Sequence, residues 1–402
     1  MTADLLDPLE LLGALVAARS PNPPGDERAA AGVVREAARA LGLPEPAEYR
    51  RSAERPNLLI RIGDHYPGAP RLMLAGHLDT MPPGNLSSWQ TDPYALTCAD
   101  GRLAGLGVAD MKSGVAAALL AAGRLAADPG WRGGLDLLFV ADEENCSDYG
   151  MKWLAGQQVL TADAAVILEP AGGAPAESWA RLFVAQRGSC VVRLTARGTP
   201  GHSAEQIPAG ERAGVALARA MAALADAELF AQQAHPIDGT RPTVNIGTMV
   251  SGGITPFMHP ESMTAIVEVR VIEGMTMAGV HDELRSALDR AGLADRVEIA
   301  AADPPHDWVP PSSAAGVGQL TGAAAAAMRS VLGAEPRPGV LLGVTDSCWL
   351  TEAGIPTLPA FGCGSLAVAH RPNEWIPPGD LTTAIDLTEA LVRAYPTPPR
   401  LA

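Results

Sequence analysis

The sequence contains few aromatic residues, no long apolar run and no closely spaced cysteine pair. Aromatic residues make up only 4% of the 402 residues, whereas 47% are hydrophobic, so we expect cores built from small aliphatic side chains. No segment approaches the roughly 18 uninterrupted apolar residues of a transmembrane helix. The N-terminal segment is acidic and has neither the basic region nor the cleavage site of a secretory signal peptide. We therefore expect no role at a membrane.

Basic residues are outnumbered by acidic ones, 30 Lys and Arg against 45 Asp and Glu, which gives a net charge of −15. This balance argues against nucleic-acid phosphate or anionic lipid as the main partner, and it leaves carboxylates that can bind cations. The five cysteines are scattered and odd in number, so they do not indicate a disulfide framework or a thiolate zinc site. Buried small side chains in a reducing cytoplasm explain them better, and we expect a cytoplasmic protein.

The chain is too long for a single core, and its patterning changes twice. Apolar runs separated by helical segments occupy the first part and the last part, a pattern typical of a mixed, mostly parallel sheet with helices on both faces. Between them, half-exposed strands follow the order strand, helix, strand, strand, helix, strand, which predicts a ferredoxin-like α+β domain. We therefore predict an α/β domain formed by 1–186 and 305–402, interrupted by an inserted α+β domain at 187–304.

The first candidate site is the motif GHLDT, which contains His77 and Asp79. It directly follows the apolar run Arg71–Gly76, and open α/β sheets bind their ligands at the carboxyl ends of such strands. Residues i and i+2 of a strand point the same way. We therefore expect the Asp79 carboxylate to accept the ring N–H of His77 and to orient the ring as a metal ligand. Taken alone, such a pair more often marks a histidine that is simply satisfied at a strand end.

The second candidate is the segment GLGVADMKSG, which contains Asp110 at the start of an Ala-rich helix. It resembles the dinucleotide fingerprint GxGxxG, which makes an NAD-dependent dehydrogenase an alternative function. That fingerprint requires a strand directly before it and a glycine at position 110, and here the preceding residues are polar and typical of a turn. Nucleotide binding is therefore disfavoured, although Asp110 alone is often explained as a helix N-cap.

Further acidic and histidine residues follow other predicted strands. They are Glu143 and Glu144 in VADEEN, Glu169 in ILEP, and His370 and Glu374 in AHRPNE. Each of them alone is more often a solvated surface residue. Together with the two earlier motifs they place two histidines and at least four carboxylates at strand ends of one sheet, a set that suits zinc, cobalt or manganese. Five ligands exceed the needs of one tetrahedral ion, so we expect two ions, roughly 3.5–4 Å apart, that share a carboxylate.

In this order and spacing, the motifs resemble the dinuclear zinc metallopeptidase family that includes carboxypeptidase G, aminoacylase, acetylornithine deacetylase and succinyl-diaminopimelate desuccinylase. The resemblance extends over nearly the whole chain, including the N-terminal SPNPPGDE. It implies two divalent metal ions, zinc first and cobalt or manganese as alternatives. The implied ligands are His77, Asp110 and Glu169 for one ion and Asp110, Glu144 and His370 for the other. It also implies that Glu143 is the general base and that the Asp110–Met111 peptide bond is cis.

The inserted domain resembles the lid and dimerisation domain of that family, which implies a homodimer formed through it. By the same resemblance, His202 in GTPGHSAE reaches the active site of the partner subunit and helps to stabilise the oxyanion, and Arg270 in VEVR binds the substrate carboxylate. The alternative for Arg270 is an ion pair with Glu268 on the same strand face. Asp346 in GVTDS lies either near the substrate pocket or at a helix N-cap.

Three departures from the family pattern concern segments that commonly touch the substrate in relatives. Arg212 stands in GERA where the lid helix usually begins GxNA, and Phe257 stands in GGITPFMHP where GGxxxN carries an asparagine. The C-terminal loop GCGSLAVAH has no GPG. We therefore expect intact metal chemistry and an altered specificity pocket, with Arg212 and Phe257 as substrate-binding residues.

The resemblance implies an amide hydrolase, and Glu169 matches its deacylases and carboxypeptidases, since the aminopeptidases have aspartate there. We expect hydrolysis of an N-acyl-L-amino acid or of a small peptide with a free carboxylate. A dipeptidase is one alternative. A catalytically silent homologue that binds only metal or an amino acid is another, but drift would be expected to erode some ligand positions, and all of them are filled.

Overall fold

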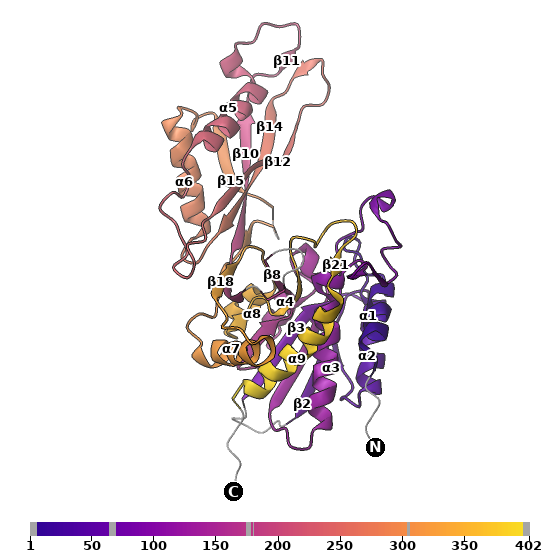
Figure 1. Ribbon diagram of the computed structural model, residues 1–402. Coiled ribbons are helices and arrows are strands. Elements are labelled where there is room, and N and C mark those ends of the chain that lie inside the picture. Colours follow the sequence, from indigo (N-terminus) through magenta and orange to yellow (C-terminus); the bar gives the residue numbers. More distant parts are fainter. Residues whose placement is uncertain (1–5, 64–69, 174–177, 180, 304–305, 397–402) are drawn as a thin grey trace. The chain divides into compact units, whose positions relative to one another are not determined.

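The computed structural model describes residues 6–63, 70–173, 178–179, 181–303 and 306–396. The chain divides into two compact units. Unit 1 consists of Met1–Gln186 and Ser312–Ala402, and unit 2 is the segment Arg187–Pro311. Figure 1 shows their helices and strands. Within the described ranges, no helix has the length and apolar character needed to cross a membrane.

Unit 1 is built on a six-stranded sheet. In spatial order its strands are β1 (Ala47–Arg50), β2 (Pro56–Gly63), β6 (Gly134–Val140), β3 (Arg71–His77), β7 (Ala164–Ile167) and β19 (Thr357–Leu358). The pairs β6–β3, β3–β7 and β7–β19 are parallel, whereas β1–β2 and β2–β6 are antiparallel. The predicted mixed, mostly parallel sheet of an α/β domain is confirmed.

Several α-helices surround this sheet. The helices of unit 1 are α1 (Pro8–Ala17), α2 (Arg28–Ala40), α3 (Ser113–Ala127), α4 (Met151–Gly156), α7 (Gly318–Leu332), α8 (Ser347–Glu352) and α9 (Pro378–Ala394). The Ala-rich α3 contacts β2, β3 and β6 and packs beside α9 (Figure 1). Most of its residues are buried. At Gly114 an added Cβ would lie 2.3 Å from the carbonyl oxygen of Leu168, so glycine allows the start of α3 to approach the segment after β7.

Three neighbouring strands of this sheet end at the same edge. The register places His77, the last residue of β3, opposite Val140 of β6, and it places Ala75 opposite Ile167 of β7. Because β3, β6 and β7 are parallel, the polar residues that follow them gather at the carboxyl edge of the sheet.

Smaller sheets complete unit 1. They are β17 (Ser312–Ser313) with β9 (Leu182–Gln186) and β18 (Pro338–Leu341), β20 (Gly362–Ser365) with β8 (Pro170–Gly172), and β21 (Trp375–Ile376) with β5 (Arg102–Ala104) and β4 (Thr97–Ala99). Strand β9 leads out of unit 1 and β17 leads back, and they pair antiparallel with Ser312 opposite Gln186. The chain therefore leaves and re-enters unit 1 at adjacent points.

Unit 2 contains an antiparallel sheet, a separate two-stranded antiparallel sheet and α-helices. Its elements in chain order are β10 (Gly188–Arg197), β11 (Gly201–His202), α5 (Ala213–Asp226), β12 (Thr243–Gly252), β13 (Met258–His259), β14 (Ser262–Val271), α6 (Met277–Arg290), β15 (Val297–Ala301) and β16 (Trp308–Val309). Alternating residues of β10 and β14, such as Val192 and Val267, form a core with Leu217 of α5 and Leu284 of α6. The order of the long strands and helices is the predicted βαββαβ.

The inserted unit ends later than the sequence indicated. We predicted its end at residue 304, but β16 pairs with β10, with Ser189 opposite Val309 and Cys190 opposite Trp308. Trp308 and Val309 therefore lie on the sheet of unit 2, and the unit ends at Pro311. The predicted boundary at residue 304 itself lies outside the described residues. The two residues of β16 are too few to show the alternation by which a strand is recognised.

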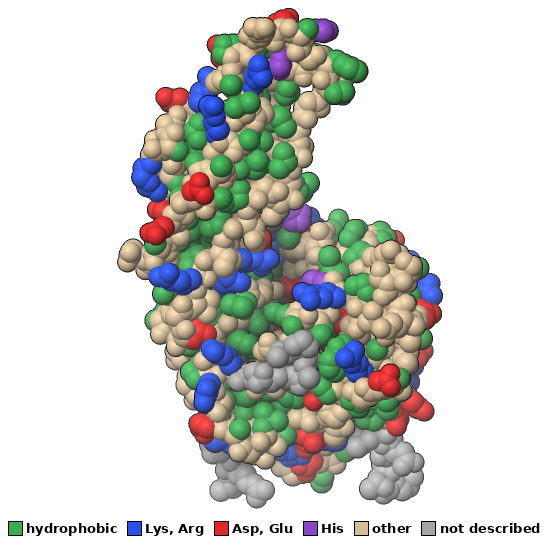
Figure 2. All heavy atoms as spheres, turned by 45° about the horizontal axis from the view of Figure 1, so that its top comes forward, with side chains coloured by type: hydrophobic (Ala, Val, Ile, Leu, Met, Phe, Trp, Pro, Cys, Tyr) green, Lys and Arg blue, Asp and Glu red, His purple; other side chains and the backbone are tan. Residues whose placement is uncertain are grey.

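The surface drawn in Figure 2 carries both signs of charge. On this face, Lys and Arg side chains are interspersed with Asp and Glu side chains and with apolar atoms.

Candidate metal centre

His77, the last residue of β3, is the centre of a group of buried polar side chains. Its Nε2 atom lies 3.0 Å from Oδ1 of Asp110 and 3.2 Å from Oε1 of Glu169, and its side chain is 1% exposed. Glu169 follows β7, the strand beside β3, so these two side chains come from one sheet edge. Asp110 comes from the turn that precedes α3.

Asp110 faces a second histidine with its other carboxylate oxygen. Its Oδ2 atom lies 3.2 Å from Nε2 of His370, and the same nitrogen lies 3.0 Å from Oε2 of Glu144. Asp110 lies in the turn Val108–Lys112, where its backbone is not helical (φ −124°, ψ 93°). Its peptide bond to Met111 is cis, which confirms what the family resemblance implied. One carboxylate thus stands between two imidazoles.

The spacing of these atoms is compatible with a divalent metal ion bound by histidine and carboxylate ligands. Ligands at about 2.0–2.1 Å from a tetrahedral zinc ion are about 3.3 Å apart, and the nitrogen–oxygen separations here are 3.0–3.2 Å. Ligand atoms of His77, Asp110 and Glu144 lie within 4.8 Å of one another, and so do those of His77, Glu143 and Glu169. Imidazole and carboxylate together suit zinc, cobalt or manganese.

The carboxylates of this group are crowded in a buried space. Burial, followed by the negative charge of Asp110, raises the pKa of Glu169 to about 8. Burial likewise raises the pKa of Glu143 and of Glu144 above the usual range of glutamate. Hydrogen bonds with Asp110 and Glu144 raise the pKa of His370 to about 11. The negative charges of these carboxylates must be compensated by protons or by cations. Divalent ions compensate them while the ligands stay deprotonated.

Glu143 and Glu144 are adjacent in the 3-10 turn Glu143–Asn145 that follows β6, but they take different positions. Glu144 directs Oε2 toward His370, and its Oε1 accepts a hydrogen bond from the backbone N–H of Met81 (2.9 Å). Oε2 of Glu143 lies 4.0 Å from Nε2 of His77. Glu143 thus lies at the margin of the group, whereas Glu144 lies within it.

Asp79 faces the ring of His77 with its backbone oxygen as well as with its carboxylate. The ring Nδ1 of His77 lies 3.0 Å from the backbone oxygen of Asp79 and 3.5 Å from its carboxylate Oδ1, so the backbone oxygen has the closer contact. The carboxylate accepts hydrogen bonds from the backbone N–H groups of Glu143 (3.2 Å) and Glu144 (3.1 Å). The two-residue period does not reach Asp79, because β3 ends at His77. A proton on Nδ1 still leaves Nε2 of His77 available as a ligand.

Glu374 has a position that the sequence did not reveal. Its buried carboxylate accepts hydrogen bonds from the backbone N–H groups of Gly107 (3.0 Å), Ala109 (2.7 Å) and Asp110 (3.0 Å). Burial raises its pKa to about 7. Glu374 therefore fixes the turn that carries Asp110 to the segment that carries His370. The sequence signal was only an acidic residue near a candidate histidine, with no indication of its partners.

Asp346 occupies the N-cap position of α8, one of the two places that the sequence left open. Its side chain makes no capping hydrogen bond. It accepts a hydrogen bond from Oγ of Ser147 instead, and burial raises its pKa to about 7. Its negative charge also contributes to the raised pKa of Glu143, so the two carboxyl groups are electrostatically coupled.

Four predicted substrate or catalytic residues belong to unit 2, and their roles stay predictions. His202 is exposed in β11, and Phe257, directly before β13, is 69% exposed. Arg212 is the N-cap residue of α5, and its Nε donates to a backbone oxygen at 2.8 Å. Arg270 forms an ion pair with Glu268 (2.7 Å), which is the alternative that the sequence left open.

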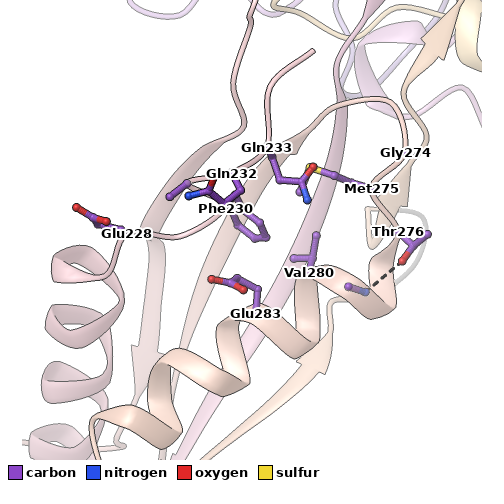
Figure 3. Close-up of a pocket in the computed structure, with 11 residues that line it drawn as sticks. Glu228, Phe230, Gln232, Gln233, Gly274, Met275, Thr276, Val280 and Glu283 are labelled. Atoms are coloured by element: carbon purple, nitrogen blue, oxygen red, sulfur yellow. Dashed lines mark hydrogen bonds between the residues drawn. The ribbon is translucent and has the colours of Figure 1, made fainter. Parts of the chain in front are cut away.

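A cavity of about 330 Å³ in unit 2 is lined by other residues. It lies beside the start of α6 and is lined by Phe230, Met275 and Val280 together with the glutamates at 228 and 283 (Figure 3). None of the predicted site residues lines it, and its lining contains neither histidine nor cysteine. Its chemistry therefore differs from that of the group around His77.

Comparisons with known proteins identify relatives of the whole chain. The family model of peptidase family M20/M25/M40 matches residues 73–394. A succinyl-diaminopimelate desuccinylase of Parvibaculum lavamentivorans is 28% identical over 407 residues, which cover 97% of this chain and 95% of that protein. A succinyl-diaminopimelate desuccinylase of Pseudomonas syringae is 30% identical over 325 residues, which cover 79% of this chain and 80% of that protein.

Solved structures share the fold over nearly the whole chain. An M20 family metallo-carboxypeptidase from Sulfolobus solfataricus has a TM-score of 0.74 at 20% identity, covering 97% of this chain and 99% of its own. Human carnosine dipeptidase 1 has a TM-score of 0.73 at 18% identity, covering 96% and 95%. At these identities the likeness concerns the fold alone. Because the family model matches most of the chain, this protein is a hydrolase that belongs to peptidase family M20/M25/M40.

Proposed function

We propose that this protein is a dinuclear metal-dependent amidohydrolase that cleaves an N-acyl-L-amino acid or a small peptide with a free carboxylate. The observation that carries the proposal is the Asp110 carboxylate, whose two oxygens lie 3.0 Å from His77 and 3.2 Å from His370. A deacylase is favoured over a dipeptidase, because the curated relatives are succinyl-diaminopimelate desuccinylases, whereas the likeness to a dipeptidase concerns the fold.

The family implies divalent metals, and the donor set around His77 would hold two of them. Zinc is the first candidate, with cobalt or manganese as alternatives. The ligands would be His77, Asp110 and Glu169 for one ion and Asp110, Glu144 and His370 for the other. When bound, such ions polarise a carbonyl group and lower the pKa of a bound water.

Glu143 would act first as general base and then as general acid. Its carboxylate would accept a proton from the attacking water and donate that proton to the nitrogen of the leaving amine, so that the amide yields an acid and an amine. Burial raises the pKa of Glu143 well above its ordinary range, and a carboxyl group with a raised pKa is suited to hold a proton between the two transfers. Asp79 would keep His77 and the backbone of Glu143 in place.

The inserted unit would supply substrate contacts and a homodimer interface. His202 would stabilise the oxyanion in the active site of a partner subunit. Arg270 would bind the substrate carboxylate in exchange for Glu268, its present partner. Arg212 and Phe257 would shape the pocket for the acyl group or the side chain. The cytoplasmic location expected from the composition stays a prediction.

A hydrolysis screen with the purified full-length protein tests this proposal. N-succinyl, N-acetyl and N-aroyl amino acids and dipeptides are offered with added zinc, cobalt or manganese, and amine release is measured together with the metal content per chain. We expect hydrolysis of at least one N-acyl amino acid, loss of activity with a chelator and recovery with metal. Bound metal without hydrolysis across the panel would favour a binding homologue, and binding of NAD without inhibition by chelators would favour a dehydrogenase.

A further inference from the structure

The N-terminal motif SPNPPGDE, residues 20–27, runs along the sheet edge that carries the candidate metal centre. The backbone N–H of Asn22 donates to the carbonyl oxygen of Thr80 (2.8 Å), and the backbone N–H of Thr80 donates to the carbonyl oxygen of Ser20 (3.0 Å). The Ser20 hydroxyl donates to the carbonyl oxygen of Leu78 (2.6 Å). The motif is therefore attached to the segment that follows β3. The proposed mechanism assigns no role to any residue of this motif.

The side-chain amide of Asn22 lies between two carboxylates. Its Nδ2 donates to Oδ2 of Asp79 (2.9 Å) and to Oδ1 of Asp142 (3.0 Å), and Asn22 is 2% exposed. Its Oδ1 accepts a hydrogen bond from Nη1 of Arg55 (3.4 Å). The amide therefore uses its nitrogen as a donor to both aspartates and its oxygen as an acceptor.

Arg55 brings a buried positive charge to the same place. Its guanidinium contacts Oδ1 of Asp142, and its Nε lies 3.1 Å from Oε2 of Glu27. The Arg55 side chain is only 7% exposed. Buried carboxylates need donors or cations to compensate their charge. The aspartates at 79 and 142 therefore depend on the amide that they share, and Asp142 also depends on the guanidinium.

The Asp79 carboxylate in turn holds the backbone of the turn Glu143–Asn145, and the Asp142 carboxylate holds the backbone of Tyr149, which follows that turn. Asp79 accepts hydrogen bonds from the N–H groups of Glu143 (3.2 Å) and Glu144 (3.1 Å). Asp142 enters the turn with a φ of 67°, in the left-handed region, and its Oδ2 accepts a hydrogen bond from the N–H of Tyr149 (3.0 Å). The orientation of both aspartates therefore sets the backbone positions from which the side chains of Glu143 and Glu144 extend.

We propose that Asn22 and Arg55 are positioning residues for the turn Glu143–Asn145, acting through the two aspartates. The inference rests on the proposed function, in which Glu143 transfers the proton and Glu144 binds a metal. Neither Asn22 nor Arg55 touches the reacting atoms in this scheme. Their removal misplaces the proton-transfer group, and a misplacement of about 1 Å in an active site costs about 10²-fold in rate.

Substitutions of Asn22 test the inference against a purely structural role. Asn22→Ala removes the shared amide, and Asn22→Asp keeps its shape but adds a third carboxylate between the two aspartates. At saturating metal we expect both variants to lose about 10²-fold in kcat with KM changed by less than about threefold. Ser20→Ala is the matched control, because its hydroxyl anchors the same segment without contacting either aspartate, and we expect it to keep kcat within about threefold of wild type.

Arg55 provides a rescue experiment. Arg55→Met removes the charge and every hydrogen-bond donor, and we expect it to lose kcat as Asn22→Ala does. Arg55→Lys keeps a cation that can reach Asp142, so we expect it to recover part of that loss. A positioning role would be contradicted if kcat fell equally in the Lys and Met variants and if this fall matched the decrease in the fraction of folded protein.

Hydrogen exchange of the metal-free protein gives a readout that does not depend on hydrolysis. In both Asn22 variants we expect exchange of the Glu143 and Glu144 N–H groups to become at least about tenfold faster, with little change in Ser20→Ala. Unchanged exchange, or a loss of kcat that Ser20→Ala reproduces, would overturn the inference. If exchange accelerates but the wild-type protein hydrolyses no amide, the positioning stands and the proposed function fails.

Discussion

Nε2 of His77 lies 3.0 Å from Oδ1 of Asp110, although 33 residues separate the two in the chain. His77 ends a strand and Asp110 precedes a helix, and they meet because α3 packs against β3. The second oxygen of Asp110 faces His370. Asp110 is thus the one residue on which both halves of the proposed metal centre depend.

Asp110→Asn should therefore remove the shared ligand. The amide has the size of the carboxylate but carries no negative charge and only one oxygen. We expect fewer than two ions per chain after dialysis, measured by elemental analysis, and a corresponding loss of hydrolysis. Asp128→Asn, at a surface ion pair with Arg393, is the control. Two tightly held ions in the Asp110 variant would contradict the assignment of a shared carboxylate.

Glu143→Gln and Glu144→Gln should separate proton transfer from metal binding. Glutamine cannot take up the proton, so we expect Glu143→Gln to keep its metal and to lose about 10²–10⁴-fold in kcat. Glu144→Gln should weaken the ion that His370 also binds, because Glu144 lies 3.0 Å from that histidine. Metal analysis and steady-state kinetics of the two variants check this. Near-normal turnover of Glu143→Gln would refute its role as base.

Glu374→Gln should loosen the turn that carries Asp110. In the wild-type protein both carboxylate oxygens of Glu374 accept hydrogen bonds from backbone N–H groups. In the variant an NH₂ group replaces one of these oxygens, so at least one buried backbone N–H loses its acceptor. We expect the free energy of unfolding of the metal-free protein to fall by about 1–3 kcal/mol and metal affinity to fall with it. Denaturant titration and chelator competition measure these quantities. The exposed Glu352 provides the control Glu352→Gln, and equal stability of the two variants would disprove the expectation.

Glu27 should make stability depend on pH. Burial, followed by the charge of Asp79, raises the pKa of Glu27 from 4.5 to about 8, although Arg55 opposes the shift. Between these values the folded protein holds a proton that the unfolded chain has released. The stability that this proton contributes is complete below pH 4.5 and is lost as the pH rises through about 8.

Glu27→Gln removes this titration. We expect the free energy of unfolding of the variant, relative to wild type, to rise with pH across that window by at most about 1.4 kcal/mol per pH unit. Urea unfolding of both metal-free proteins at several pH values between 5 and 8 measures the difference. A difference that stays constant with pH would show that Glu27 is ionised in the folded state.

Local patterning was sufficient to predict the sheet edge and several of its residues. Residues that follow neighbouring parallel strands meet at one edge whatever the details of the packing, so His77, Glu143 and Glu169 could be grouped before their distances were known. The resemblance to the metallopeptidases added the pairing of Asp110 with His370. Alternation of apolar and polar residues likewise predicted the order in which strands and helices follow one another along the chain of unit 2.

Other contacts could not be predicted from any periodic pattern in the sequence. Glu374 meets the N–H of Gly107 across 267 residues, and Asn22 meets Asp142 across 120. Such hydrogen bonds form only when the packed core brings distant segments together. Periodicity and motif order specify which residue types gather at the edge. Packing of the complete unit specifies which atom of each residue faces which partner, because close-packed interiors fix side chains to a fraction of an ångström.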